Sequence, residues 1–458
     1  MANESTTSTT ARLGLVTATL LVVANIIGSG IFVTPGEILQ TLPTGTGLLL
    51  VFAVGGLLSL FGALAYGELA AAMPRSGGEY HYLKELYHPL VGFLSGFVSL
   101  VAGFSAPIAL SATGFGFYLS ELAPLTGLKS EIPLGPLTLH FNDPVFYAAG
   151  LIILLTGLHS LQVSHGARVQ NLFTLLKVGL IAVFILAGLL VGPSVPANYA
   201  VGAQEWSLIL GSPFALGLIS VYFAYSGWNA AAYLSGEIRN PERNVPRALL
   251  LGTLIVVVLY LLLNWVFLRT VPLESLSGQV TVGKLSANAI FGTVGGNFVT
   301  MLISLALVSS VSSMVMAGPR ITAAMGSDFP FFRRLGHLNR NQVPANALLL
   351  QMLIALFVVF TSSFFSILIY VGFMLSFFAM LAVGGVFILR VKGYHLPYKT
   401  WGYPVTPALF VGLCLWIIGN SIVSNPQALV AGLATLVVGV ALYVLANRNP
   451  PGSDPNAR

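Results

Sequence analysis

The hydrophobic positions of this chain form long runs that contain no Asp, Glu, Lys or Arg. About 20 apolar residues let an α-helix cross the roughly 30 Å hydrocarbon core of a bilayer, so each run predicts at least one membrane-spanning helix. The last two runs are each about twice that length and contain a polar break, so each predicts two spans and the chain predicts twelve. The runs cover residues 13–36, 38–67, 86–120, 144–167, 178–204, 206–236, 248–268, 285–319, 341–389 and 400–447.

The same runs exclude a membrane β-barrel, whose strands alternate apolar and polar residues over about ten positions. They are continuous stretches of Leu, Val, Ile, Ala and Phe, which are typical of membrane helices. We therefore predict an all-α membrane protein. Residues 1–11 and 448–458 predict short polar tails, and the first tail lacks the basic cluster of a cleavable signal peptide.

Composition supports this interpretation. Only 7% of the 458 residues are charged, against about 25% in a soluble globular protein, and 56% are apolar. That is too little polar side chain to cover several soluble domains. The single cysteine, Cys414, excludes a disulfide scaffold and a cysteine-cluster metal site.

The chain carries a net charge of +6, and the positions of its basic residues indicate an orientation in the membrane. If the N-terminus is cytoplasmic, sixteen Lys or Arg residues fall inside, and only Lys129, Arg269 and Lys284 fall outside. Because cytoplasmic loops carry an excess of basic residues, we expect both termini in the cytoplasm and the protein in the inner or plasma membrane of the cell. The basic residues are scattered between apolar runs, which does not favour nucleic-acid binding.

Two predicted spans are interrupted near mid-membrane. The first contains Gly28-Ser29-Gly30, and the sixth contains Phe223-Ala224-Tyr225-Ser226-Gly227-Trp228-Asn229. An unwound turn exposes peptide groups whose burial without partners costs several kcal/mol each, so such breaks persist where they face a polar cavity. The alternative is that Gly28-Ser29-Gly30 is only a small-residue surface for close helix packing. A second break five spans later, in the inverted orientation, favours a binding site.

The breaks suit a zwitterion. A half-helix that begins at Ser29 and Gly30 presents unpaired N–H groups and the positive end of its dipole, which suit a carboxylate. Half-helices that end near Ile27 and Phe223 offer free carbonyls, which suit an ammonium group. An α-amino acid carries both groups, so we expect it to be the substrate.

Four segments give the chain a resemblance to the amino acid-polyamine-organocation superfamily, and within it to bacterial relatives of the L-type amino acid transporters. They are Gly28-Ser29-Gly30-Ile31-Phe32 with Thr34-Pro35, Pro74-Arg75-Ser76-Gly77-Gly78-Glu79-Tyr80, the second break, and Glu237-Ile238-Arg239-Asn240-Pro241-Glu242-Arg243 with Pro246. The resemblance implies a LeuT-like core of two inverted five-helix repeats, alternating access, and no enzymatic activity. The repeats would span 12–193 and 206–390, and two peripheral helices would lie in 405–447.

The resemblance also implies a set of substrate-binding residues. The Ser29 hydroxyl and the amides of Ser29 and Gly30 would bind the carboxylate. Carbonyls of Ile26, Phe223 and Ser226 would bind the amine, and Phe223 could act as a gate. The full expected set is Ile26, Gly28, Ser29, Gly30, Phe223, Ala224, Ser226 and Asn229. Animal L-type transporters have a disulfide-linked heavy chain, which we do not expect here because the loop between spans 3 and 4 has no cysteine.

Lys177 lies about ten residues into the fifth span, where an unpaired charge costs about 2.5 to 3.5 kcal/mol. It should therefore face the bundle interior, with carbonyls of the first break and hydroxyls of span 8 as partners; snorkelling to the interface is the alternative. The candidate hydroxyls are Ser309, Ser310, Ser312 and Ser313. The resemblance places a lysine where sodium-coupled relatives bind a cation, so we predict sodium-independent transport. Lys177 could instead lose and regain a proton in each cycle.

The expected side-chain pocket is uncharged. The candidates could each also be ordinary helix packing; they are Ser105, Pro107, Ile108, Phe223, Tyr225, Trp228, Tyr370 and Met374. Without an acidic residue at this depth, a neutral amino acid is the simpler substrate. Arginine exchangers of the superfamily carry an acid at the position of Asn229, so the amide here counts against cationic substrates.

Weaker signals concern the cytoplasmic side. Residues 79–88 predict a short interfacial helix, and Glu237 and Arg239 could pair at an inner gate or remain solvated. His159 and His165 fall in a predicted loop without a carboxylate or cysteine at metal-ligand spacing, so we expect no metal. No Walker sequence is present, and we expect no cofactor.

These inferences predict a secondary transporter that exchanges small or medium neutral L-amino acids without sodium. One alternative is a proton-coupled symporter of amino acids, including cationic ones, or of polyamines. The alternative from another class is a channel or an amino acid sensor on a transporter fold. Two inverted breaks around one closed site favour alternation over a continuous pore.

Overall fold

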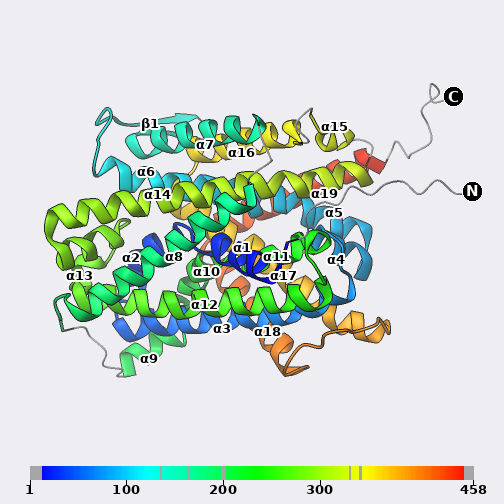
Figure 1. Cartoon of the computed structure of the whole chain (residues 1–458), viewed down its shortest axis with the longest axis horizontal. Coiled ribbons are helices and arrows are strands. Elements are labelled where there is room, and N and C mark those ends of the chain that lie inside the picture. The colour runs from blue at the N-terminus through cyan, green and yellow to red at the C-terminus, as the bar shows by residue number, and fades with distance from the viewer. Residues whose placement is uncertain are drawn as a thin grey trace, which may run out of the picture.

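The computed structural model describes residues 13–134, 137–161, 166–196, 203–329, 332–339 and 343–447. The predicted tails at 1–11 and 448–458, and His165, lie outside these ranges. Nearly every described element is a helix, and the long helices run along one axis of the molecule (Figure 1).

The first half of the chain begins with the predicted interruption, because α1 ends at Ile26 and α2 begins at Gly30. A short helix, α4, connects two long helical segments, and a π-helix, η1, lies within the second of them. The elements are α1 (Leu15–Ile26), α2 (Gly30–Thr41), α3 (Gly45–Ala72), α4 (Glu79–Leu86), α5 (Pro89–Val98), η1 (Ser99–Ser105), α6 (Ala106–Ser120), β1 (Lys129–Leu134), β2 (Leu137–Asn142), α7 (Asp143–Leu161) and α8 (Gly166–Leu190).

The second half contains the other predicted interruption, between α10 and α11. Its elements are α9 (Ala203–Ile209), α10 (Ser212–Ala224), α11 (Ala230–Tyr233), the 3₁₀ turn η2 (Ser235–Glu237), α12 (Pro241–Thr270), α13 (Leu273–Leu276), α14 (Val282–Asp328), α15 (Arg333–Gly336), α16 (Ala345–Thr361), α17 (Phe364–Val391), α18 (Val405–Ser424) and α19 (Pro426–Asn447). The long α14 is kinked at Gly292, whose φ of 69° is non-helical.

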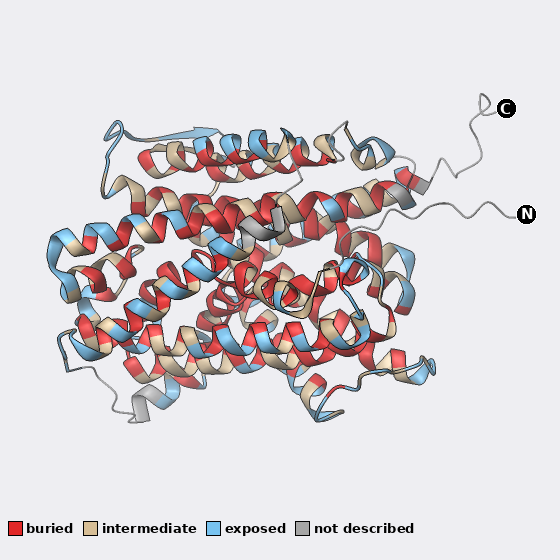
Figure 2. Ribbon diagram, viewed as in Figure 1, coloured by how far each residue is buried: buried red, intermediate tan, exposed pale blue. Residues whose placement is uncertain are grey.

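The described part of the chain holds ten helical segments that are long and apolar enough to cross a membrane. Two further apolar helices, Ser212–Ala224 and Ala345–Thr361, are shorter. Large apolar side chains on the outer helices, such as Leu172 and Leu176 on α8 and Leu433 and Val437 on α19, are exposed. Figure 2 shows the buried residues on the inward faces and the exposed residues on the outer faces. Such an exposed apolar surface fits a protein surrounded by lipid.

The all-α prediction missed one feature. Residues between α6 and α7 form an antiparallel hairpin, in which Lys129 pairs with Asn142 and Leu134 with Leu137. The segment Leu137-Thr138-Leu139-His140 alternates apolar and polar residues, which is the strand signal, but it is too short to span a membrane. The hairpin lies beside α7 and α16 (Figure 1).

A buried ion pair joins α3 to α17. Arg390 donates from Nε and one terminal nitrogen to the two carboxylate oxygens of Glu68, at 2.7 and 2.8 Å, and the Thr400 amide donates to the same carboxylate at 2.6 Å. The guanidinium also lies 3.6 Å from the ring centroid of Tyr403. Nearby in the core, the side chain of Cys414 on α18 is fully buried.

Candidate functional site

The first break leaves three residues, Ile27, Gly28 and Ser29, between α1 and α2. Ile27 has an extended backbone with ψ of 94°, so α1 cannot continue through it. Gly30 then begins α2 against the other broken helix, because a Cβ atom at this position would lie 2.5 Å from the Cα of Ala224. Only glycine allows this approach.

The second break is a turn from Tyr225 to Asn229 between α10 and α11. Gly227 has a φ of 96°, a conformation that side chains disfavour, and a Cβ there would lie 2.8 Å from the carbonyl carbon of Asn25. The two interruptions are therefore present, and each packs against the backbone of the other.

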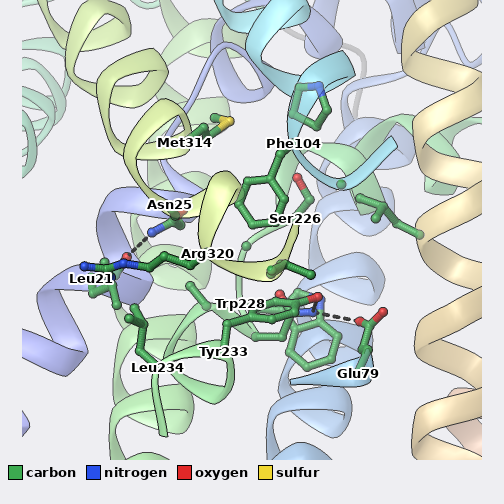
Figure 3. A pocket seen from close by; sticks show the side chains of 18 of the residues that line it. Leu21, Asn25, Glu79, Phe104, Ser226, Trp228, Tyr233, Leu234, Met314 and Arg320 are labelled. Atoms are coloured by element: carbon green, nitrogen blue, oxygen red, sulfur yellow. Dashed lines mark hydrogen bonds between the residues drawn. The ribbon is translucent and has the colours of Figure 1, made fainter. Parts of the chain in front are cut away.

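A cavity of about 400 Å³ lies along these two breaks and continues between η1, α6 and α14 (Figure 3). Glu237 and Arg320 also line it, and their side chains are 46% and 42% exposed. They mark its mouth. Gly77, just before α4, and Gly336 of α15 also line the cavity, so this mouth faces the end of the molecule that carries these two helices. Figure 1 shows α4 and α15 at the same end, which we call the basic end because Lys84, Arg333 and Arg334 lie on them.

At the opposite end the structure is tightly packed. The Gly278 amide donates to the Gly36 carbonyl at 2.7 Å, and a Cβ on Gly36 would lie 2.1 Å from the Gln279 carbonyl oxygen. The segment after α13 thus packs directly on α2. The cavity is accessible from the basic end in this conformation.

All eight residues of the expected substrate-binding set line this cavity. Ser29 is fully buried, and within the described part of the chain its hydroxyl has no hydrogen-bond partner. The first turn of α2 adds peptide N–H groups that lack intrahelical acceptors. A buried free hydroxyl beside a helix N-terminus is suited to an anion such as a carboxylate.

The carbonyl side of the cavity is partly occupied by internal bonds. The Ile26 carbonyl accepts from the Tyr260 hydroxyl at 2.9 Å, and the Phe223 carbonyl accepts from the Ser226 amide at 2.9 Å. A carbonyl oxygen has two lone pairs, so each can accept one more bond from a guest.

Lys177 lies in the bundle interior and is 2% exposed. Its Nζ donates to the Ile27 carbonyl at 2.9 Å and to the Ser310 hydroxyl at 2.8 Å, and Ser310 donates to the same carbonyl at 2.9 Å. The ammonium group thus lies at the C-terminal end of α1, where the helix dipole favours a cation. It does not line the cavity itself.

Of the four candidate hydroxyls, Ser310 bonds to Lys177, whereas Ser312 and Ser313 have other partners. Successive residues of a helix are rotated by about 100°, so Ser312 faces away from Ser310 and instead contacts His159 Nε2 at 2.8 Å. Ser313 lies on the same side as Ser310 but donates to its carbonyl at 2.8 Å. His159 lies in α7 and contacts α14 through Ser312, so it is not the solvated loop residue that the sequence suggested.

Of the side-chain pocket candidates, Pro107, Phe223 and Trp228 line the cavity and the others do not. The π-helix η1 turns α6 so that Pro107 and Ser111 face the cavity, while Ser105 is buried elsewhere and Ile108 packs in a cluster with residues of α7. The Tyr225 hydroxyl donates to the Phe52 carbonyl at 3.1 Å.

The two candidates on α17 also point away from the cavity, toward α19. Tyr370 exchanges a hydrogen bond with Thr435 at 2.9 Å. Met374 is fully buried, and its sulfur lies 3.0 Å from where a Cβ on Gly432 would be. Peripheral helix α19 therefore takes the face of α17 that the sequence suggested for the substrate.

Glu79, which sequence reasoning placed only in an interfacial helix, lines the cavity. Its Oε1 accepts from the Tyr66 hydroxyl at 2.5 Å and from Asn229 Nδ2 at 2.9 Å. Burial raises the pKa of the Glu79 carboxyl to about 7, although the bonds from Tyr66 and Asn229 act in the opposite direction. The signal was the preceding Gly77-Gly78, with φ of 120° and 53°, which turns the start of α4 into the bundle.

At the mouth, the partner of Glu237 is Arg320, not Arg239. The two charged groups are 3.7 Å apart. The backbone amide of Arg239 donates to the Leu13 carbonyl at 2.9 Å, within a short bridge between Leu13 and Ile238. The charged pair therefore joins η2 to α14.

Comparison with known proteins adds independent information. A family model described as amino acid permease matches residues 13–445. The serine/threonine exchanger SteT of Bacillus subtilis is 28% identical, with 94% of this chain and 96% of that protein covered. The human cystine/glutamate transporter is 29% identical over 95% and 85% of the two chains. The human large neutral amino acids transporter small subunit 2 is 28% identical over 95% and 80%.

Proposed function

The chain belongs to the amino acid permease family, and from this premise we propose that it exchanges small or medium neutral L-amino acids, without sodium, by alternating access. It is an integral membrane transporter of amino acids and not an enzyme. The relatives named above include a serine/threonine exchanger and a large neutral amino acids transporter subunit, which supports exchange of a neutral substrate.

One observation carries the proposal: the free Ser29 hydroxyl and the start of α2 face the cavity that the carbonyls of Ile26 and Phe223 also border. Donors stand at one break, and acceptors stand at the ends of both preceding half-helices. A molecule with a carboxylate and an ammonium on one carbon satisfies both sets. A polyamine would leave the donors without a partner.

Lys177 supports sodium independence. Its ammonium group occupies a buried position between the Ile27 carbonyl and the Ser310 hydroxyl, where oxygen ligands from two helices converge. A positive charge is already supplied there by the chain, so a sodium ion would meet direct electrostatic repulsion.

For the architecture, we propose twelve crossings. The α10–α11 pair and α16 would add two spans to the ten long ones. The repeats would cover 12–193 and 206–390, related by inversion, with α18 and α19 peripheral. Both termini and the basic end would face the cytoplasm, in the cell membrane. We propose transport without a disulfide-linked heavy chain, because the sole cysteine is buried in α18.

Thermal stability of the purified protein tests the substrate class. A ligand that binds only the folded state raises the unfolding midpoint, so serine, alanine and leucine should raise it. Ethanolamine, which is decarboxylated serine, and putrescine should not. Stabilisation by ethanolamine but not by serine would reject the carboxylate site. Proteoliposomes loaded with unlabelled serine or left empty then separate exchange from uniport, because exchange needs the internal amino acid.

A further inference from the structure

Glu79 differs in its partners from Glu68 and Asp143, the other two carboxylate residues with less than a tenth of their surface exposed in the described chain. Glu68 is paired with Arg390, and Asp143 accepts hydrogen bonds from the Leu125, Thr126 and Gly127 amides. Glu79 is 3% exposed, and no ion pair to it is present among the described residues. Its bonded partners are neutral, so nothing compensates a negative charge there.

The groups around this carboxyl come from α3, α4, α10, α11 and the second break. Tyr66 from α3 and Asn229 from the second break bond to Oε1, and the hydroxyl of Tyr233 from α11 interacts with the carboxyl. Tyr82 on α4 and Tyr222 on α10 are the remaining titratable neighbours. The cation of the same cavity, Arg320, is paired with Glu237 at the mouth. The Tyr66 and Asn229 donors both reach the same oxygen of Glu79, Oε1, so Oε2 is the oxygen that can carry a proton.

The rest of α4 is fixed to helices outside the breaks. Tyr80 and Lys84 both donate to Asp328 at the end of α14, the latter at 2.7 Å. Tyr87 donates to the Leu381 carbonyl of α17 at 2.7 Å. The first residue of α4 therefore holds the turn before α11, while the following turns hold α14 and α17. Any movement of α11 relative to these helices must change the Glu79–Asn229 contact.

We infer that Glu79 is a proton-binding residue of the transport cycle, protonated while Asn229 contacts it in this conformation and ionised when the turn before α11 moves away. The inference rests on the proposed function, since it needs a cycle in which α11 moves. The proton leaves the Glu79 carboxyl through the cavity to water at the basic end, and the Asn229–Oε1 hydrogen bond breaks as the turn moves. As a neutral acid, Glu79 keeps both hydrogen bonds at Oε1; as an anion, it must be hydrated, which requires the turn to open.

Exchange in proteoliposomes tests the role in transport. With L-serine and L-leucine as probes, wild-type exchange should change several-fold between pH 6 and 8.5, because a group that titrates near pH 7 loses its proton over this range. Glu79→Gln keeps an acceptor oxygen without the charge, so its rate should vary with pH much less than that of wild type. Glu121→Gln, a partly exposed carboxyl paired with Lys284, is the matched control and should keep the wild-type profile. A Glu79→Gln profile like that of wild type would overturn the inference.

Tyr66→Phe is a second variant, for which the direction of the shift in the pH profile can be predicted. The Tyr66 hydroxyl lowers the pKa of Glu79, so its removal should move the midpoint of the pH profile upward. A change in the maximal rate with an unmoved midpoint would indicate a structural role only and would overturn the inference.

A measurement without transport separates failure of this inference from failure of the proposed function. The folded-state pKa of Glu79 is above its ordinary value, so the folded state keeps the proton to a higher pH than the unfolded state does. Glu79 therefore makes the protein less stable as pH rises from about 4.5 to about 7. The unfolding midpoint of wild type should therefore fall relative to that of Glu79→Gln over this range. If the unfolding midpoints of wild type and Glu79→Gln change with pH in the same way, Glu79 binds no proton, whatever the exchange assays give. If the curves diverge but no amino acid is exchanged, only the proposed function fails.

Discussion

Gly30 and Ala224 touch backbone to backbone, because a Cβ atom on Gly30 would lie 2.5 Å from the Cα of Ala224. The start of α2 and the end of α10 therefore form one contact between the two interrupted helices. The donors of the first break and the acceptors of the second are held at a fixed separation by this contact.

Gly30→Ala should disrupt that contact. The added methyl group meets backbone, which cannot rotate away, so we expect a loss of roughly 1–3 kcal/mol in stability and a loss of exchange. Gly28→Ala is the control for stability, since its Cβ would lie 3.6 Å from the Ser111 hydroxyl, an ordinary contact. The measurement is the unfolding midpoint of both variants. Equal midpoints would contradict the contact.

Ser29→Ala should weaken substrate binding without unfolding the protein. A hydrogen bond to a charged group contributes about 1.5–3 kcal/mol, which corresponds to a roughly 10- to 100-fold weaker affinity. Ser105→Ala is matched, because Ser105 is also buried with a free hydroxyl but does not line the cavity. Serine binding, followed by thermal shift against concentration, checks both. Equal losses in the two variants would reject a specific role for Ser29.

Lys177→Ala should abolish or strongly slow exchange. It leaves the Ile27 carbonyl and the Ser310 hydroxyl with one partner fewer in a buried place, at a cost of about 1–3 kcal/mol. The control is Lys284→Ala, which removes a partly exposed ion pair with Glu121 and should cost less than about 1 kcal/mol. Unchanged rate and pH dependence in Lys177→Ala would contradict both a fixed cation and a proton carrier at this position.

Arg390→Met should destabilise the protein by about 3–5 kcal/mol, because it strands the buried Glu68 carboxylate. The double variant Arg390→Met with Glu68→Gln removes the charge as well and should recover part of the loss. Denaturation of both variants gives the coupling energy. If the double variant loses the sum of the two single losses, the ion pair contributes nothing beyond its separate residues.

The helices and their two interruptions could be predicted because they depend on local sequence. Uncharged length predicts a span, and Gly28-Ser29-Gly30 places a break within two residues of Ile26, where α1 ends. Lys177 could be paired with the first break by depth alone, since a buried ammonium needs oxygen partners at its own level.

What sequence reasoning missed depends on rotation and on turns. The π-helix turns α6 so that Ser111, which was not a candidate, faces the cavity beside Pro107 while Ile108 does not, and no propensity rule predicts the extra residue of a π-helical turn. Ser310 and Ser312 are distinguished only by the helix phase relative to α8. Glu79 enters the cavity because Gly78 packs against the Tyr233 ring, a contact between segments about 150 residues apart.

The complete burial of Cys414 has a practical consequence. Since this is the only thiol in the protein, maleimide reagents should leave the unmodified chain unlabelled. A cysteine introduced at the mouth of the cavity, for example at the exposed lining residue Leu338, would then be the single reactive position. The labelling rate of this cysteine would report how often the mouth of the cavity is open. The native Cys414 would not have to be replaced first.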